Sequence, residues 1–283
     1  MELETTAKKP LLSNYLESPL ENPNSYEDNI PIYAEFASKD PFSLESLFQC
    51  SCLQSRNSLT HKEFLSFQRL SLYCKKPINL DLEDQKRILR GIWNELFLNE
   101  NPPLESRLSH EKWKDIGFQN SSPDSDFRSG GLMALKNMRV FVETNKDLVR
   151  EIIRNQEKEE FLFAISSINV SFFLKKYFLM AEPVDYKQNK DLVVCSKSAF
   201  KSFCGFLHQD DEVLEKMHDF ILKDLYYTWR KKKANNSVMN IMAFNAVFKE
   251  IQAIFHRKLI KFHLKGFEIM EKKYIERLER LNN

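Results

Sequence analysis

Glycine and cysteine are both scarce in this sequence of 283 residues. Six glycines stand against twenty-three phenylalanines, which argues against the turn-rich pattern of an all-β protein and leaves few glycine loops that could cradle a phosphate. The five cysteines are scattered, with no paired spacing beyond one C-x-C, so the pattern indicates neither a disulfide framework nor a zinc site. We therefore expect reduced thiols, no metal ion and a largely helical fold.

Long hydrophobic runs are also missing. The most apolar stretch, residues 161–174 (FLFAISSINVSFFL), contains three serines and an asparagine, and it is shorter than the roughly 20 residues needed to cross a bilayer. It predicts a buried core helix. The opening residues, MELETTAKKPLLSNYLE, lack a basic segment followed by an apolar stretch and have Glu at position 2. We therefore expect a cytoplasmic protein with no signal peptide, no myristoylation and no integral membrane segment.

Charge is nearly balanced over the whole chain but unevenly distributed along it. The net charge is +2, yet residues 1–45 hold three Lys and nine Asp or Glu, a net of −6. The remainder therefore carries +8, the difference between +2 and −6. A basic body suits an acidic protein partner or the cytoplasmic face of a membrane. Residues 230–233 (RKKK) are interpreted as a solvated loop, and no basic run is interleaved with aromatics, so we expect no nucleic-acid partner.

The chain divides into an acidic beginning and a helical body. Half of the ten prolines fall in the first 45 residues, so residues 1–42 are predicted to be an extended or disordered acidic lead-in. Residues 43–80 then show helical spacing and predict N-terminal helices that pack on the domain. Asp81 is expected to cap the next helix, whose apolar face begins at Leu82.

Helical spacing of apolar residues continues through most of the remaining chain. It covers residues 81–97, 132–141, 145–180, 213–229 and 238–259. These segments predict an all-α domain of many helices spanning residues 81–260. Over 264–281 the apolar stripe narrows to a seam among charged residues, which predicts a C-terminal amphipathic helix extension over 261–283. We expect this long C-terminal helix to dock on the protein's own core, with binding of a helical protein partner through 264–281 as the alternative.

One segment between the helices, residues 113–131 (WKDIGFQNSSPDSDFRSGG), has neither helical nor strand period. Its large apolar side chains can bury the underside of a loop that folds onto the body, while Gly117 allows a tight bend. Arg128 follows Asp126 and precedes two glycines, so its guanidinium is positioned to project from a stiff support. The alternative is a surface ion pair between Asp126 and Arg128 that merely holds the loop.

The same segment carries a long motif. The string W-x-x-I-G-F-Q-x-x-x-P-x-[S/T]-D-F-R, from Trp113 to Arg128, resembles the signature of the ELMO (engulfment and motility) domain. The stretch beginning at Phe161 resembles that family's F-x-F-A-I-x-x-I-N helix, and Ile241 to Val247 (IMAFNAV) resembles its I-M-x-F-N-x-V helix. The resemblance extends from about Leu82 to Leu259 and implies an all-helical domain.

The resemblance also implies an activity. Small members of the family look like GTPase-activating proteins for Arf-family and Arf-like small GTPases, which makes Arg128 the implied catalytic residue, supplied in trans as an arginine finger. The GTPase would hold the nucleotide and Mg²⁺, so this chain would need no cofactor of its own. Residues implied to contact the partner are Gln119, Asp126, Ser129 and Gly130, and those implied to support the loop are Trp113, Ile116, Gly117, Phe118, Phe127 and Gly131. The family usually has Gly where this chain has Ser129, and a positive φ there would cost on the order of 1 kcal/mol.

A second interpretation belongs to another class of protein. Larger members of the family support guanine-nucleotide exchange factors, so the alternative is a non-catalytic adaptor or a structural subunit of an exchange-factor, ciliary or trafficking complex. Arg128 would then be a structural residue, and residues 264–281 with the acidic lead-in would bind the partner. An exposed Arg128 without a carboxylate partner favours the arginine finger, whereas a buried pair with Asp126 favours the adaptor. Association with a cilium or a membrane is compatible with the resemblance.

Overall fold

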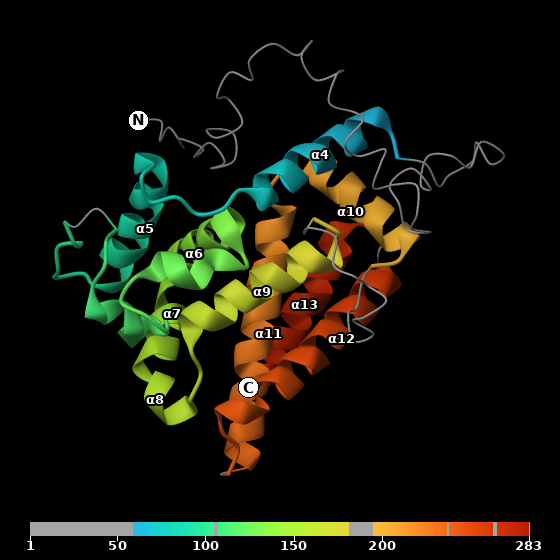
Figure 1. Ribbon diagram of the computed structural model, residues 1–283. Helices are drawn as coiled ribbons and strands as arrows, with labels where there is room; N and C mark the ends of the chain where they lie inside the picture. The colour runs from blue at the N-terminus through green and yellow to red at the C-terminus, as the bar shows by residue number, and fades with distance from the viewer. Residues whose placement is uncertain (1–58, 105–106, 181–194, 237, 263–264, 283) are drawn as a thin grey trace, which may run out of the picture.

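The computed structural model describes residues 59–104, 107–180, 195–236, 238–262 and 265–282, and every regular element in these ranges is a helix (Figure 1). The all-α prediction is confirmed. In chain order the elements are α4 (His61–Lys75), α5 (Glu83–Leu96), η3 (Glu111–Ile116), η4 (Pro123–Arg128), α6 (Gly131–Thr144), α7 (Lys146–Arg154), α8 (Gln156–Glu159), α9 (Phe163–Tyr177), α10 (Lys197–Gln209), α11 (Val213–Asn235), η5 (Ile241–Ala243), α12 (Phe244–Phe262) and α13 (Phe267–Asn282). Within the described ranges, no helix is both long and apolar enough to span a membrane.

Helix α4 begins at a capping box. The Glu63 N–H donates to Thr60 Oγ1 at 3.3 Å, and the Thr60 N–H donates to Glu63 Oε2 at 2.7 Å, so two helix-terminal donors are satisfied reciprocally. The helix buries Phe67, Leu70 and Cys74 and packs on α10 and α6. The acidic lead-in and the first of the predicted N-terminal helices, which contains Leu44, Leu47 and Phe48, lie outside the described residues.

The start of α5 differs from the prediction. The helix begins at Glu83, and the residue before it, Leu82, makes no side-chain cap. Asp81 does not cap the helix, because Leu82 occupies the N-cap position. The Asp81 backbone N–H donates to Asn79 Oδ1 at 2.9 Å. The Asn79 N–H in turn donates to Gln85 Oε1 at 2.7 Å, so the approach to α5 is held through Asn79. Leu82 is 51% exposed and does not belong to the buried face.

The segment expected to be helical over 145–180 is divided into three helices. Glu160 takes a left-handed conformation with φ 51°, which ends α8 and lets the chain turn into α9. The carbonyl of Glu159 accepts a hydrogen bond from Trp229 Nε1 at 2.7 Å, which fixes this corner against α11. Helix α9 buries ten of its side chains, from Phe163 to Tyr177. The prediction of a buried core helix in this stretch is therefore confirmed.

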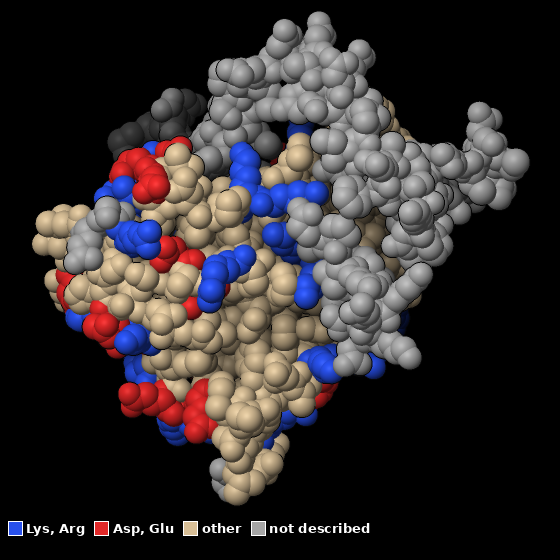
Figure 2. Space-filling model, in the orientation of Figure 1, with Lys and Arg blue, Asp and Glu red and all other residues tan. Residues whose placement is uncertain are grey.

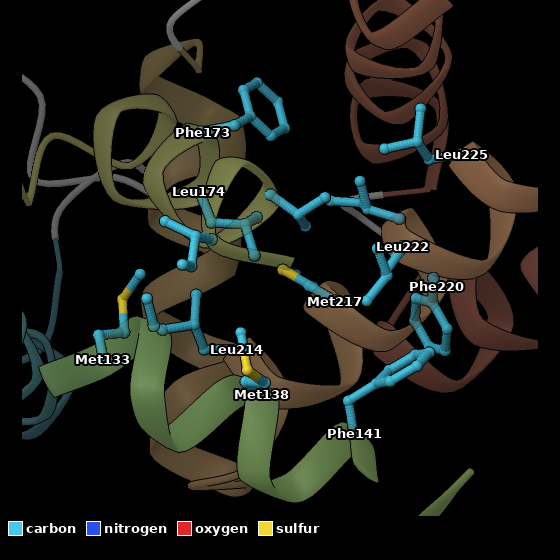
Figure 3. Close-up of a cluster of buried hydrophobic side chains, with 14 of the residues drawn as sticks. Met133, Met138, Phe141, Phe173, Leu174, Leu214, Met217, Phe220, Leu222 and Leu225 are labelled. Atoms are coloured by element: carbon cyan, nitrogen blue, oxygen red, sulfur yellow. The ribbon is translucent and has the colours of Figure 1, made fainter. Parts of the chain in front are cut away.

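The centre of the molecule lies where α6, α9 and α11 meet. Their apolar side chains point towards one another in Figure 3, where the labelled residues are Met133, Met138 and Phe141 of α6, Phe173 and Leu174 of α9, and Leu214, Met217, Phe220, Leu222 and Leu225 of α11. Helix α11 is longer than predicted, because residues 230–233 continue it. The loop prediction for this basic run was wrong: Arg230 pairs with Glu151 at 2.7 Å and Lys233 with Glu160 at 3.0 Å.

Helices α12 and α13 complete the bundle along α11. The predicted helix over 238–259 starts late, since Val238 is 82% and Met242 is 85% exposed before α12 begins. In α13, the seam residues Met270 and Tyr274 are buried against the protein's own core. The apolar seam of 264–281 is thus used inside the chain, which leaves little of it for the alternative, a partner helix.

Candidate functional site

The motif segment connects α5 to α6 and is more ordered than a simple loop. It contains two short 3₁₀ helices, η3 and η4. His110 starts η3, where its Nδ1 accepts a hydrogen bond from the Lys112 N–H at 3.2 Å, and Pro123 starts η4, where the missing N–H of proline costs nothing. The two halves are tied together, since the His110 N–H donates to the Ser121 carbonyl at 2.9 Å.

A row of aromatic rings supports this segment from below. The ring of Trp113 lies edge-to-face with Trp93 of α5 at 5.1 Å and with Phe118 at 5.5 Å, and Phe118 lies 5.6 Å from Phe127. Trp113, Phe118 and Phe127 are all buried. The indole Nε1 of Trp113 also donates to the Leu108 carbonyl at 2.7 Å. Edge-to-face rings interlock, so the row fixes η4 relative to α5.

Gly117 allows the motif segment to lie in close contact with the start of α9. Its φ is 92°, and a Cβ at this position would lie 2.8 Å from the backbone nitrogen of Phe163 and 2.9 Å from Gln156 Oε1. Neither the conformation nor the space admits another side chain. The neighbouring Ile116 is buried. Five of the residues predicted to support the loop therefore form one packed underside: Trp113, Ile116, Gly117, Phe118 and Phe127.

The Asp126 side chain forms its hydrogen bonds within the motif segment. Its carboxylate accepts the Gln119 backbone N–H at 2.7 Å and lies 3.4 Å from Asn120 Nδ2. These contacts close the turn between η3 and η4. The Gln119 side chain is exposed, as is that of Ser129. Of the residues predicted to contact a partner, Gln119 and Ser129 thus lie at the surface, while Asp126 organises the backbone beneath them.

Arg128 ends η4 and is exposed. Its Nε donates to the Ser125 carbonyl at 2.7 Å, which ties the guanidinium to the same short helix. Among the residues that the structure describes, none offers a carboxylate within ion-pair distance of Arg128. The alternative of a surface ion pair with Asp126 is therefore wrong, because the Asp126 carboxylate is turned to Gln119.

The glycines after Arg128 have different roles. Ser129 has φ −80° and ψ −38°, which any residue adopts, so the strain considered for serine at this position does not arise. Gly131 is the left-handed residue, with φ 61°. A Cβ on it would lie 2.5 Å from the Lys76 carbonyl oxygen, which accepts the Leu132 N–H at 3.0 Å. Gly130 is buried, so it presents no surface to a partner, contrary to the prediction.

The bracing of Gly131 by Lys76 could not be read from the motif. The two residues are far apart in sequence, and no pattern links them, since the contact uses backbone atoms. The glycine is the one sequence feature that a short backbone contact of this kind requires.

Other candidate chemistry is absent from the described part of the chain. No group of three His, Cys, Asp or Glu side chains is placed there to hold a metal ion. Burial raises the pKa of the Cys195 thiol to about 12 and also raises the pKa values of Cys74 and Cys204, so these thiols stay protonated and unreactive. His256 donates to or accepts from the Tyr177 hydroxyl at 2.8 Å, which indicates a structural role.

Comparison with known proteins identifies a matching family. The model of the ELMO/CED-12 family matches residues 68–248. The chain is 25% identical over 246 residues to ankyrin repeat and ELMO domain-containing protein D of Dictyostelium discoideum, covering 85% of this chain and 17% of that protein. It is 25% identical over 207 residues to ELMO domain-containing protein 1 of Mus musculus, covering 66% and 56%.

A shorter segment is more similar to a human protein. Over 79 residues, the chain is 37% identical to ELMO domain-containing protein 1 of Homo sapiens, covering 28% of this chain and 23% of that protein. In each of these comparisons the match spans less than two thirds of the relative's own length. No solved structure matches the chain.

Proposed function

This chain belongs to the ELMO/CED-12 family, and from that premise we propose that it is a GTPase-activating protein for a small GTPase of the Arf or Arf-like family. It supplies Arg128 in trans to the active site of the GTPase. The single observation that carries the proposal is the state of Arg128: exposed, tethered through Nε to Ser125, and without a carboxylate partner in the described part of the chain.

The chemistry requires only a guanidinium from this chain. During GTP hydrolysis, negative charge grows on the oxygens around the transferring phosphoryl group, and an arginine delivered there stabilises the transition state. Such an arginine finger raises turnover by roughly 10³ to 10⁵. The nucleotide, the Mg²⁺ ion and the residue that orients the attacking water belong to the GTPase. Loss of the proton from the attacking water and departure of GDP also take place in the active site of the GTPase.

The geometry of the segment supports this role through preorganisation. An arginine side chain that is mobile before binding must lose its rotamer freedom on contact, which weakens the complex. The hydrogen bond from Nε to the Ser125 carbonyl fixes part of the side chain beforehand. It engages Nε alone, so the terminal amino groups keep their capacity to form a bidentate contact with phosphate oxygens.

The test is single-turnover GTP hydrolysis by a panel of purified Arf-family and Arf-like GTPases, measured as phosphate release. We expect acceleration of at least one GTPase by the unmodified protein, and loss of most of that acceleration in Arg128→Ala and Arg128→Lys, because a compact ammonium does not replace the planar fork. Arg257→Lys, at an exposed arginine of α12, is the control and should keep full activity. Acceleration that survives Arg128→Ala would remove the arginine finger from the mechanism.

The adaptor remains the competing function, and the same panel decides between them. An adaptor would bind a GTPase or another protein without changing hydrolysis. Binding without acceleration by any member of the panel, together with equal binding by the unmodified protein and Arg128→Ala, would favour the adaptor.

A further inference from the structure

One face of α4 carries an exposed basic stripe. Lys62, Arg69, Leu72 and Lys76 are all exposed, and their spacing of seven, three and four residues places them on one side of the helix and its C-terminal cap. The stripe is about 21 Å long at a rise of about 1.5 Å per residue. The opposite side of α4, with Phe67, Leu70 and Cys74, is buried. We call Lys62, Arg69, Leu72 and Lys76 the α4 stripe.

The cations of the α4 stripe have no ion-pair partner among the described residues. Elsewhere Lys136 pairs with Glu215 and Arg277 with Asp224. For Lys62, Arg69 and Lys76, the described part of the chain provides no carboxylate within ion-pair distance. The acidic residue of α4, Glu63, is turned to the Thr60 cap at the start of the helix. The positive potential of this face therefore extends into solvent.

The α4 stripe ends at the candidate site. Lys76, its last residue, accepts the Leu132 N–H through its carbonyl at 3.0 Å and lies against Gly131, three residues after Arg128. Figure 2 shows Lys and Arg side chains gathered over the region of α4, α6 and α9, with Asp and Glu concentrated towards α5 and α8. Helix α9 adds to this region, since it contains Lys175 and Lys176 and no acidic residue.

We propose that the α4 stripe is the docking surface for an acidic face of the small GTPase, beside the nucleotide pocket that Arg128 enters. The inference rests on the proposed function and identifies how the partner is held. Leu72, 43% exposed between Arg69 and Lys76, supplies an apolar contact within a charged rim, which is the usual arrangement of a protein–protein interface. A surface rich in Asp and Glu is the chemistry that complements this stripe.

A protein surface fits the α4 stripe better than a membrane does. A helix that lies in a bilayer interface needs a broad apolar face directed to the lipid. In α4 that face is occupied by packing on α10 and α6, and the stripe offers one leucine. Charge alone would bind a membrane weakly, whereas charge around an apolar contact orients a protein partner.

We expect the α4 stripe to affect the association of the two proteins and not the rate of the chemical step. Complementary charge raises the association rate and lowers the apparent KM, and the effect declines with ionic strength. Reversing Arg69 and Lys76 together should therefore raise KM for the GTPase about tenfold at low salt, with kcat unchanged. Arg128→Ala should do the opposite and lower kcat, because Arg128 acts in the transition state.

The experiment compares Arg69→Glu/Lys76→Glu with Lys158→Glu/Lys231→Glu, which changes net charge equally. Lys158 and Lys231 are exposed, and Figure 1 places α8 and the C-terminal end of α11 at the opposite end of the molecule from α4. We expect the raised KM only in the first variant, and expect added salt to reduce the difference. An unchanged KM in the first variant, or an equal rise in both, would overturn the proposal. Circular dichroism and thermal unfolding establish that both variants are folded.

Direct binding separates failure of this inference from failure of the proposed function. The full chain carrying Arg128→Ala, with and without the α4 reversals, is titrated with GTPases loaded with a non-hydrolysable GTP analogue. Weaker binding with the reversals would support the docking surface even if no GTPase is accelerated. Unchanged GTPase binding, combined with loss of binding to vesicles of phosphatidylcholine and phosphatidylserine, would overturn it and make the α4 stripe a membrane contact.

Discussion

Asp126 and Arg128 lie two positions apart in η4 and engage different partners. The Asp126 carboxylate accepts the Gln119 N–H at 2.7 Å, while Arg128 Nε donates to the Ser125 carbonyl, also at 2.7 Å. Asp126 closes the turn between η3 and η4, and Arg128 is held at the end of η4. Opposite charges so near in sequence would ordinarily pair at a surface, so this separation leaves the guanidinium available for a partner.

The role of Asp126 can be tested by removing its carboxylate. Asp126→Ala leaves the Gln119 N–H without its acceptor, and we expect a loss of about 1 to 3 kcal/mol in the free energy of unfolding together with a lower kcat for GTPase activation. Asp124→Ala is the control, since Asp124 lies in the same short helix and has no such contact among the described residues. Denaturant unfolding and phosphate release are the measurements. Equal behaviour of the two variants would show that Asp126 does not organise the segment.

Gly131 and Gly266 form a matched pair for a second prediction. Both have a positive φ, 61° and 97°, but a Cβ on Gly131 would lie 2.5 Å from the Lys76 carbonyl oxygen, while nothing lies within 4 Å of one on Gly266. Gly266→Ala should cost about 1 kcal/mol for the left-handed conformation alone. Gly131→Ala should cost a further 1 to 3 kcal/mol or so, because backbone atoms must move. Equal losses in denaturant unfolding would contradict the close approach.

The attachment of α13 gives a third prediction. Arg277 Nε donates to Asp224 Oδ2 at 2.7 Å, and the Asp224 side chain is 0% exposed. Arg277→Ala leaves a buried carboxylate whose remaining hydrogen-bond partner among the described residues is the Thr228 hydroxyl, which should cost about 3 to 5 kcal/mol. Arg280→Ala, in the exposed part of α13, should change the free energy of unfolding by no more than about 0.5 kcal/mol. If Arg277→Ala proved as mild as Arg280→Ala, the docking of α13 on α11 would be in error.

A pH dependence follows from His218. This side chain is buried, lies 3.1 Å from both the Ser167 hydroxyl and carbonyl, and stacks edge-on to Phe141. Burial lowers the pKa of His218 from 6.5 to about 4. The folded protein therefore binds fewer protons than the unfolded chain between these values, so the contribution of His218 is complete above about pH 6.5 and is lost as pH falls towards 4.

The expected slope is up to about 1.4 kcal/mol per pH unit in that window. His218→Gln should remove this part of the slope, whatever its effect on stability at neutral pH. His208→Gln, at an exposed histidine, is the control. The measurement is the free energy of unfolding by urea at several pH values from 7 down to 5. A slope that is the same in His218→Gln as in the unmodified protein would exclude His218 as its source.

Much of the fold follows from the spacing of apolar residues, and its errors have local causes. Helix α10 was not predicted, although Phe200, Phe203 and Leu207 recur at helical spacing on its buried face. Ser196 also caps this helix through the Ala199 N–H. The basic run after Trp229 was predicted to be a loop, yet Arg230, Lys232 and Lys233 pair with acidic residues from other parts of the chain. Such pairing depends on tertiary neighbours, which periodicity cannot supply.

The site was more accessible to sequence reasoning than these boundaries were. The aromatic residues and Gly117 identified the underside of the segment, because large apolar side chains among turn residues require burial. The orientation of Arg128 did not follow from the sequence. It depends on which donor the Asp126 carboxylate accepts from and which acceptor Arg128 donates to, and the motif is equally compatible with a direct pair between the two. The proximity of the α4 stripe to the motif segment depends on the backbone contact between Lys76 and Gly131, which leaves no pattern in the sequence.

The contact between Trp93 and Trp113 has a spectroscopic consequence. Their rings lie 5.1 Å apart at 72°, close enough for the two indole transitions to couple, whereas Trp229 sits apart in α11, hydrogen-bonded to Glu159. Near-ultraviolet circular dichroism should therefore contain a paired signal from the α5 and η3 junction. That signal gives the motif segment an intrinsic, label-free reporter of its own integrity while a GTPase is being added.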